Sequence, residues 1–343
     1  MQSVSYSLKQ FKKANKIAII THMNADADAI GSTMALKILL QKRYKSNPKL
    51  KIDIFTDTEK FAENLLPMVS HAIFNSRHYK RYDLAILLDC PNSTRAGRFE
   101  EIFLNAKDTL LIDHHETAQK QGNNNVIMTT SSVCEIIYNK YIKSHKFKYS
   151  SEVLRLIYSG IITDTNDLSQ NVHQTTHKVI ADLLEKDREM GLSLETIHDY
   201  FFKNTSKQKM ALLARGLKSL AFYCNDQIAF MTLFKQDLNE TGCKQEDTLG
   251  IVDVALRMKG VNICGIFIKQ EDNSYYVSLR SKGNIDVAKI ALTFNGGGHL
   301  HIAAFQSSLP LAEIKQTLIA KCKEQLALQD ENAPLEQLFA EEI

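Results

Sequence analysis

The first half of the chain alternates short, uniformly apolar runs with longer stretches in which apolar residues recur every three or four positions. The apolar runs lie at 16–21, 49–57, 82–90 and 108–115, and the helix-like stretches at 29–44, 58–70, 131–145 and 151–162. Apolar strands separated by amphipathic helices are typical of a parallel sheet covered on both faces. This half of the chain is therefore predicted to form an α/β domain.

The pattern changes near residue 186, where a polar and mostly helical segment begins. The elements predicted beyond it are a hairpin at 220–234, a helix at 245–258, strands at 261–269 and 274–281, a helix at 284–295, a Gly-rich turn and a long helix from about 310. Strands next to strands favour a smaller α/β domain with a mixed sheet. The expected boundaries are 1–188 for the first domain, 189–209 for a linker helix, 210–328 for the second domain and 329–343 for an acidic, solvated tail.

Composition narrows the class of protein. A formal net charge of +3 over 343 residues is too small to indicate an extended nucleic-acid surface, so any nucleic acid is expected as short pieces in a local cleft. The sequence has no bilayer-length apolar run and no secretory signal pattern. The six cysteines are scattered without a CxxC pair, which predicts free thiols and disfavours a cysteine zinc site. We therefore expect a cytoplasmic protein without a membrane partner.

Ionisable residues stand where several of the apolar runs end. His22, Asp26 and Asp28 follow the first run, and Asp89 follows LAILL. Asp113, His114 and His115 end the run LLIDHH, and Asp164 follows LIYSGII. The carboxyl ends of parallel strands open on one edge of a sheet, where ligands bind. These side chains are therefore expected to converge.

Carboxylates gathered without partners would repel one another strongly, and divalent cations resolve that repulsion. Aspartate oxygens combined with one or two imidazoles suit Mn²⁺, Fe²⁺ or Zn²⁺ better than Ca²⁺ or Mg²⁺. Each motif alone has an ordinary explanation, since Asp is a preferred helix N-cap. Together the motifs supply enough ligands for two ions about 3.5–4 Å apart, which can clamp a phosphate and activate a water. Two divalent cations are expected, with Mn²⁺ as the first choice.

The segments HMNADADAIGS, LLDCPNSTRAGR, IDHHE and SGIITDT resemble, in order and spacing, the four metal-site motifs of the DHH phosphoesterase superfamily. SLRS and GGGHLHIAA are similar to the DHHA1 domain that usually follows. The combination looks most like the NrnA-type oligoribonucleases and 3′-phosphoadenosine 5′-phosphate (pAp) phosphatases. The resemblance covers nearly the whole chain. It implies an N-terminal, parallel-sheet DHH metal-binding catalytic domain and a smaller, mixed-sheet DHHA1 substrate-binding domain.

The resemblance also implies roles for the residues at the strand ends. One cation would be held by His22 and Asp26, the second by Asp28, His114 and Asp164, and Asp89 would bridge the two. Asp113 is expected to orient a histidine, because metal-bound imidazoles usually donate their other N–H to a neighbour. His115 would face the scissile phosphate. Arg95 would contact phosphate or hold its loop, with a purely structural ion pair as the alternative.

In the second domain, Gly296, Gly297 and Gly298 would let backbone N–H groups approach an anion closely. Their ordinary explanation is a helix C-cap followed by a flexible loop. The resemblance implies instead that His299 and Arg280 bind the terminal phosphate of a nucleotide across the cleft from the metals. Such a clamp would measure substrate length. His301 is expected to be structural.

The chain also departs from the family pattern at three positions. Asn166 stands where a glycine is expected, Leu168 where an aromatic residue is usual, and Phe305 where a small residue is common. None of these departures removes an expected metal ligand. They put substrate preference in question more than activity.

The predicted function is metal-dependent hydrolysis of short RNA oligonucleotides (nanoRNA) to 5′-mononucleotides and of pAp to AMP, by water and without a side-chain nucleophile. Long nucleic acid is not an expected partner, and the sequence leaves open whether the protein forms a homodimer. The alternatives in the same class are a hydrolase of linear dinucleotides such as pApA, an inorganic pyrophosphatase and a long-strand DNA exonuclease. A nucleotide- or RNA-binding module without activity is disfavoured, because all six expected ligands are present.

Overall fold

The computed structural model divides the chain into two compact units, Met1–Asn204 and Thr205–Ile343. It describes residues 8–56, 74–75, 79, 81–115, 117–143, 150–191, 193–270 and 272–330. The helix predicted at 58–70 and nearly all of the predicted acidic tail lie outside the described residues.

The first unit is built on a five-stranded sheet in which all neighbouring strands are parallel. In spatial order the strands are β2 (Lys51–Phe55), β1 (Lys16–Thr21), β3 (Leu84–Leu88), β4 (Asp108–Asp113) and β5 (Asn124–Ile127). The predicted parallel α/β sheet is confirmed. Strand β5 was not predicted, because its sequence NNVI is short and half polar. Its extended conformation depends on pairing with β4.

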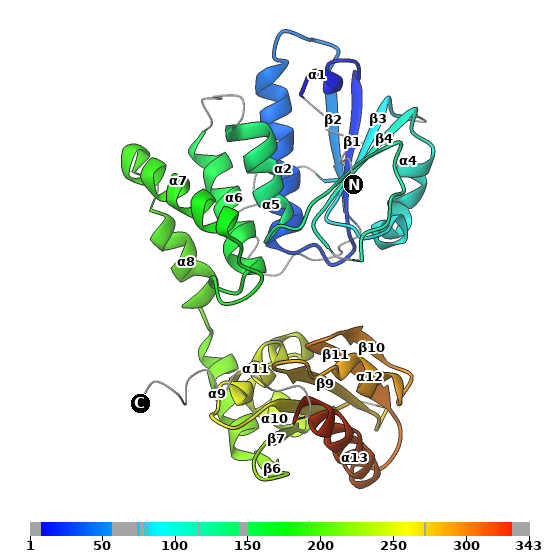
Figure 1. Cartoon of the computed structure of the whole chain (residues 1–343), viewed down its shortest axis with the longest axis vertical. Helices are drawn as coiled ribbons and strands as arrows, with labels where there is room; N and C mark the ends of the chain where they lie inside the picture. The colour runs from blue at the N-terminus through cyan, green and yellow to red at the C-terminus, as the bar shows by residue number, and fades with distance from the viewer. Residues whose placement is uncertain are drawn as a thin grey trace. The chain divides into compact units, whose positions relative to one another are not determined.

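Helices cover both faces of this sheet. Figure 1 shows α2 (Ala27–Arg43), α5 (Val133–Ile137) and α6 (Ser151–Asp164) on one side and α4 (Glu100–Leu104) on the other. Alternate residues of β1 enter the two cores: Ile17 and Ile19 pack on the α2 side, and Ala18 and Ile20 on the α4 side. A strand buried on both faces needs apolar side chains at successive positions, which explains the continuous apolar runs.

Shorter elements complete the first unit. They are α1 (Leu8–Phe11), the 3-10 helix η2 (Ser93–Phe99), the π-helical continuation of α5, η3 (Tyr138–Ile142), and the helices α7 (Gln174–Met190) and α8 (Leu194–Phe202). The segment predicted as a linker helix, 189–209, contains the end of α7, all of α8 and the start of α9 (Lys207–Lys218), with non-helical residues between them.

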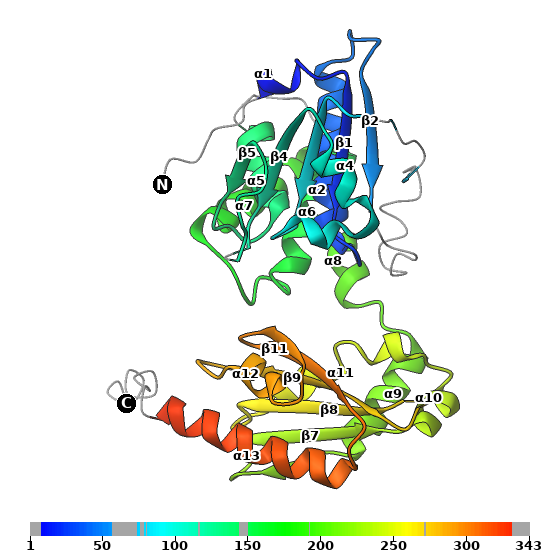
Figure 2. The same ribbon diagram turned by 90° about the vertical axis from the view of Figure 1, so that its right-hand side faces the viewer.

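The second unit has a mixed six-stranded sheet, visible in Figure 2. In spatial order the strands are β10 (Gly297–His299), β11 (Ile302–Ser307), β9 (Tyr275–Ser281), β8 (Ile263–Lys269), β7 (Ile228–Leu233) and β6 (Ala221–Tyr223). Only the pairing of β7 with β8 is parallel. The predicted mixed α/β fold is confirmed. The helical elements are α9, α10 (Lys235–Thr241), η5 (Gln245–Thr248), α11 (Ile251–Leu256), α12 (Val287–Leu292) and α13 (Leu311–Asp330).

The predicted Gly-rich turn is wrong in part. Residues 297–299 form β10, and β11, which was not predicted at all, pairs with it and with β9. Two glycines in three residues carry no strand pattern, so the pairing partner decides the conformation. Close packing explains why residue 296 is a glycine, because a Cβ atom at Gly296 would lie 2.9 Å from the Cα of Phe305.

Two further findings bear on the class of protein. All six cysteines are free thiols, and five of them are buried. Among the described helices, none combines the length and the apolar content that a membrane span requires.

Candidate metal centre

The ionisable residues predicted at the strand ends meet at one edge of the first unit's sheet. His22 follows β1, Asp89 follows β3, and Asp113 closes β4. Asp164, by contrast, is the last residue of α6, so it reaches this edge from a helix rather than from a strand.

One group of ligand atoms contains His22, Asp26 and Asp89, all within 4.8 Å of one another. The Nε2 atom of His22 lies 3.4 Å from Oδ2 of Asp89 and 3.9 Å from Oδ2 of Asp26. Asp26 is the N-cap of α2, and its Oδ1 accepts hydrogen bonds from the backbone N–H groups of Asp28 and Ala29. Its second carboxylate oxygen therefore faces the histidine.

A second group contains Asp28, His114 and Asp164, also within 4.8 Å of one another. The Nε2 atom of His114 lies 3.2 Å from Oδ2 of Asp164 and 3.6 Å from Oδ1 of Asp89. The two oxygens of Asp89 thus face a different histidine each. This carboxylate stands between the two groups.

The backbone fixes the orientation of both histidines. Nδ1 of His22 lies 2.7 Å from the carbonyl of Met23, and Nδ1 of His114 lies 3.2 Å from the carbonyl of Thr130. A carbonyl only accepts hydrogen bonds, so each Nδ1 carries the proton and donates it. In the neutral form of each ring, Nε2 then carries the lone pair and faces the carboxylates, as a metal ligand requires.

Asp28 is fully buried at the start of α2. Its Oδ2 accepts a 2.7 Å hydrogen bond from the N–H of Val133, and its Oδ1 a 2.8 Å bond from the N–H of Cys134. These are N–H groups of the first turn of α5, which have no partner within the helix. The carboxylate is thereby held rigidly beside His114.

Asp89 occupies an unusual backbone position. Its φ is +57°, in the left-handed region that non-glycine residues rarely adopt. Its N–H donates to the carbonyl of Ile112 on the neighbouring strand, which holds the residue at the end of the ladder. Left-handed residues of this kind cluster at functional sites.

Asp113 and His115 form a pair at the end of β4, next to Asp89 and His114. Oδ1 of Asp113 lies 2.7 Å from Nδ1 of His115 and also accepts the backbone N–H groups of His114 and His115. Asp113 is fully buried, whereas the His115 side chain is 36% exposed. Asp113 therefore orients the more exposed of the two histidines.

Burial and mutual charge shift the pKa values of the group. Burial acts to lower the pKa of His22, but the contact with Asp89 outweighs it and raises that pKa to about 9. Burial, followed by the charge of Asp89, raises the pKa of Asp28 to about 7. Burial and the neighbouring carboxylates hold the pKa of Asp164 well above its usual value. In the absence of a cation, the protein compensates for these carboxylates with protons.

The same residues fit a divalent cation. Among the described residues, the buried atoms Oδ1 of Asp89 and Oδ2 of Asp113 lack a hydrogen-bond partner. A buried carboxylate oxygen without a partner is costly, and a cation would satisfy the one on Asp89. Together with two Nε2 lone pairs, the donor set is the mixed nitrogen and oxygen set that Mn²⁺, Fe²⁺ and Zn²⁺ accept.

Arg95 lies in η2, on the loop after β3, and is exposed. Its carbonyl accepts the N–H of Met23, which joins this loop to the segment after β1. Its guanidinium forms no ion pair with any described residue.

The predicted clamp residues all belong to the second unit. Arg280 in β9 is 15% exposed and donates from Nε to Oδ1 of Asp253 at 3.0 Å, and from Nη1 to Ser278 and the Leu279 carbonyl. Gly298 has a φ of +153°, and a side chain at Gly297 would meet open space. The backbone of His299 belongs to β10, and its side chain lies outside what the structure describes. His301 faces the hydroxyl of Ser281 at 3.2 Å.

The three departures from the family pattern have structural correlates. Asn166 has a φ of +46°, which explains why a glycine is expected there and why Asn serves in its place. Leu168 also has a positive φ and packs against the core of the first unit. Phe305 is buried and stacks on Phe294, with ring centroids 4.1 Å apart.

Two residues that support the candidate site were not predicted from the sequence. The Thr130 carbonyl orients His114, and the buried Glu135 accepts hydrogen bonds from Ser131 and Thr176 beside that loop. A signal was present, because SSVCE matches the S-x-x-E capping box at the start of a helix. Ser132 does cap α5 by accepting the N–H of Glu135.

Known proteins match this chain along most of its length. The model described as "DHH family, N-terminal domain" matches residues 16–161, and that of the DHHA1 domain matches residues 225–327. A "Probable bifunctional oligoribonuclease and PAP phosphatase NrnA" from Streptococcus mutans is 25% identical over 307 residues, which are 89% of this chain and 94% of that protein.

Two further known proteins are similar to this chain over most of its length. The "Bifunctional oligoribonuclease and PAP phosphatase NrnA" of Bacillus subtilis is 23% identical over 82% of this chain and 86% of its own length. The solved structure of an exopolyphosphatase-related protein from Bacteroides fragilis has the same fold, with a TM-score of 0.83 at 22% identity, and covers 93% of this chain and 95% of its own. The resemblance drawn from the sequence motifs is thereby confirmed. The chain therefore carries a DHH-family N-terminal domain followed by a DHHA1 domain.

Proposed function

We propose that this protein is a metal-dependent phosphoesterase that hydrolyses short RNA oligonucleotides to 5′-mononucleotides and pAp to AMP. The observation that carries the proposal is the position of Asp89, whose two oxygens face the Nε2 atoms of His22 and His114 at 3.4 and 3.6 Å. One carboxylate between two histidines suits a pair of cations that share a ligand. The names of the S. mutans and B. subtilis relatives support the choice of substrates.

We assign one cation to His22 and Asp26 and the other to Asp28, His114 and Asp164, with Asp89 shared. When bound, two such ions, with Mn²⁺ as the first choice, lower the pKa of water and neutralise phosphoryl oxygens. The chain's own residues hold the geometry. The Met23 and Thr130 carbonyls accept from each Nδ1, so that Nε2 would be the nitrogen offered to a cation, and the first turn of α5 fixes Asp28.

His115 is proposed to donate a hydrogen bond to the scissile phosphate. Its Nδ1 is engaged by Asp113, so Nε2 is the nitrogen available to a ligand. Burial acts to lower the pKa of His115, but Asp113 and Asp89 outweigh it and raise it, which favours the cationic, donating form. Arg95, exposed and without an ion-pair partner among the described residues, is proposed to add a second positive charge for the phosphate.

The second unit is proposed to bind the far end of the substrate, through Arg280, His299 and the backbone of Gly296, Gly297 and Gly298. Asp253 and Ser278 hold the Arg280 guanidinium in place, so little side-chain freedom would be lost on binding a phosphate. On this proposal the first unit is the catalytic domain and the second selects short substrates. The cytoplasmic location stays a prediction.

The test is hydrolysis in Mn²⁺ of an RNA dinucleotide, an RNA of about 24 nucleotides, pAp and pyrophosphate, each with and without a chelator. The proposal expects chelator-sensitive cleavage of the dinucleotide and of pAp, with the long RNA and pyrophosphate spared. Rapid turnover of pyrophosphate would mean that the metal centre is right and the substrate is wrong. No turnover of any substrate would favour a binding module.

The role of Arg280 is tested with a matched pair of variants. Arg280→Ala should raise the KM for pAp by about tenfold or more and change kcat less, because it removes binding energy away from the reacting bond. Arg257→Ala is the control, since Arg257 is an exposed arginine of the same unit. Equal KM values in both variants would remove Arg280 from the site.

A further inference from the structure

A second site lies at the opposite edge of the first unit's sheet. A cavity of about 1180 Å³ is lined by residues at or before the starts of the strands: Lys16 begins β1, Lys51 begins β2, and Lys107 precedes β4. The candidate metal ligands follow the other ends of the same strands. A strand of six residues is about 20 Å long, so the cavity is separate from the metal centre.

The lining of this cavity is strongly cationic. Lys16, Lys49, Lys51, Arg81 and Lys107 contribute positive charges, and Asp83 is the one acidic residue among the described residues that line it. Both carboxylate oxygens of Asp83 already have hydrogen-bond partners. Its Oδ1 accepts from Nζ of Lys107 at 2.7 Å, and its Oδ2 accepts the backbone N–H groups of Asn15 and Lys16.

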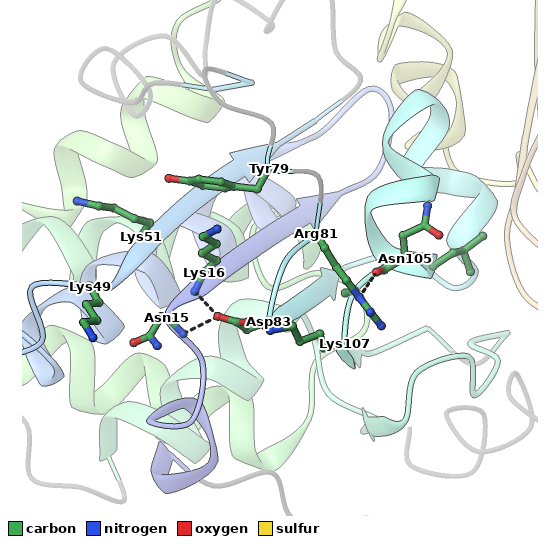
Figure 3. Close-up of a pocket in the computed structure, with 11 residues that line it drawn as sticks. Asn15, Lys16, Lys49, Lys51, Tyr79, Arg81, Asp83, Asn105 and Lys107 are labelled. Atoms are coloured by element: carbon green, nitrogen blue, oxygen red, sulfur yellow. Dashed lines mark hydrogen bonds and ion pairs between the residues drawn. The ribbon is translucent and has the colours of Figure 1, made fainter.

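Four of these cationic groups have no acidic partner among the residues that the structure describes. Nζ of Lys16 lies over the ring of Tyr79, 4.5 Å from its centroid, and Nε of Arg81 donates to the carbonyl of Asn105. Lys49 and Lys51 are exposed. None of these four side chains forms an ion pair with a residue that the structure describes. Figure 3 shows them around the cavity, with Asp83 bound to the backbone at Asn15 and Lys16.

Protection of a sheet edge explains only part of this charge. Strand β2 is an edge strand, and lysines on such strands hinder pairing with other chains. Lys51 fits that explanation. Lys16, however, lies on the interior strand β1, and Arg81 and Lys107 precede the interior strands β3 and β4. The four cations without an acidic partner among the described residues therefore span three neighbouring strands, a width of about 10 Å at the usual strand spacing, and Lys107, paired with Asp83, stands before a fourth.

We propose that this cavity binds a small molecule that carries several phosphate groups, either a nucleoside polyphosphate or inorganic polyphosphate. Ammonium and guanidinium groups spread over three strands suit a chain of phosphates better than a single phosphate. Like charges held together without an anion repel one another, and a polyanion would relieve that repulsion. The Tyr79 ring offers an aromatic surface to a base, if the ligand has one.

The test is calorimetric titration of the full-length protein with inorganic tripolyphosphate, in a chelator so that no cation occupies the metal centre. Binding should weaken by about tenfold or more in the double variant Lys49→Ala/Lys51→Ala, because two of the unpaired charges are lost. The control, Lys207→Ala/Lys218→Ala, removes two exposed lysines at the ends of α9 and should bind within about twofold of the unmodified protein.

Two further titrations identify the source of the phosphates. Binding of ATP tighter than tripolyphosphate, and sensitive to Tyr79→Ala, would identify a nucleoside polyphosphate. Equal affinities would identify polyphosphate itself. Orthophosphate should bind about tenfold more weakly than tripolyphosphate, because it reaches fewer of the cations.

Three outcomes would overturn the proposal. They are equal affinity of both double variants for tripolyphosphate, orthophosphate binding as tightly as tripolyphosphate, and a Lys49/Lys51 dependence seen with single-stranded RNA alone. Since the readout is binding in a chelator, the result does not depend on whether the protein hydrolyses RNA or pAp.

Discussion

The carboxylate of Asp28 accepts a 2.8 Å hydrogen bond from the backbone N–H of Cys134, a residue 106 positions further along the chain. A second bond, from Val133, engages the other oxygen of the same carboxylate. The candidate metal centre thus depends on the packing of α5 against the start of α2. Helix α6 packs directly against this contact at Gly160, where a larger side chain would not fit.

Gly160→Ala should destabilise the first unit and disturb the metal centre. A Cβ atom at this position would lie 2.7 Å from Oδ1 of Asp28 and 2.9 Å from Cβ of Cys134, in a buried helix contact that cannot open freely. We expect a loss of about 1–3 kcal/mol in the free energy of unfolding, together with weaker Mn²⁺ binding. Urea unfolding and calorimetric titration with Mn²⁺ measure the two effects.

The control for this variant is Gly216→Ala. Gly216 is also buried within a helix, α9, but its nearest neighbour would be the Ile251 side chain at 3.3 Å, which can shift. Its effect on stability should be small, and Mn²⁺ binding should not change. Equal effects of the two substitutions would mean that Gly160 has no particular relation to Asp28.

Asp89→Asn should abolish turnover without unfolding the protein. Asn tolerates the positive φ of this position and matches the shape of Asp, so the variant removes the shared negative charge and little else. We expect at least about a hundredfold loss of Mn²⁺-dependent hydrolysis, with the protein still folded in a chelator. Activity close to that of the unmodified protein would exclude a bridging role for Asp89.

The metal-free protein should lose stability as the pH rises. The pKa of His22 is raised to about 9 in the folded state, so the stability that its proton contributes is present below pH 6.5 and is lost as the pH rises toward about 9. The pKa of Asp28 is raised from 3.8 to about 7, so the folded state retains a proton that the unfolded state has released, and stability falls across that range too. Both pKa shifts therefore lower the free energy of unfolding as the pH rises.

Urea unfolding in a chelator, from about pH 5 to about pH 9, should therefore show a free energy of unfolding that falls by several kcal/mol. Bound Mn²⁺ should remove or reverse this trend, because the cation binds the deprotonated ligands of the folded state. A metal-free protein whose stability rises over this range would contradict the arrangement of charges described here.

Asp113→Asn should lower the pKa of His115. Asp113 is the nearest group that raises this pKa, through the 2.7 Å bond to Nδ1, and the amide keeps an acceptor oxygen but loses the charge. We expect this pKa to fall, measured by NMR titration of the histidine ring in a chelator. Asp108→Asn removes the same charge at the other end of β4 and should leave the titration unchanged.

Much of the fold could be predicted from the sequence because its signals are local. Uniformly apolar runs predict strands buried on both faces, and four strands of the first unit lie within the predicted ranges. The sequence also predicted that His22, Asp89 and His114 meet, since the carboxyl ends of parallel strands share an edge. Strand β5 and the pair β10 and β11 escaped prediction because their conformation depends on their pairing partners more than on their own side chains.

Tertiary structure alone decided how the site is held. The bond between Asp28 and Cys134 and the orientation of His114 by the Thr130 carbonyl use backbone groups, which leave no pattern in the sequence. The arrival of Asp164 from a helix end depends on how closely α6 approaches α2. The basic cavity gathers residues as far apart as Lys16 and Lys107, because strand starts that are distant in sequence become neighbours only when the sheet forms.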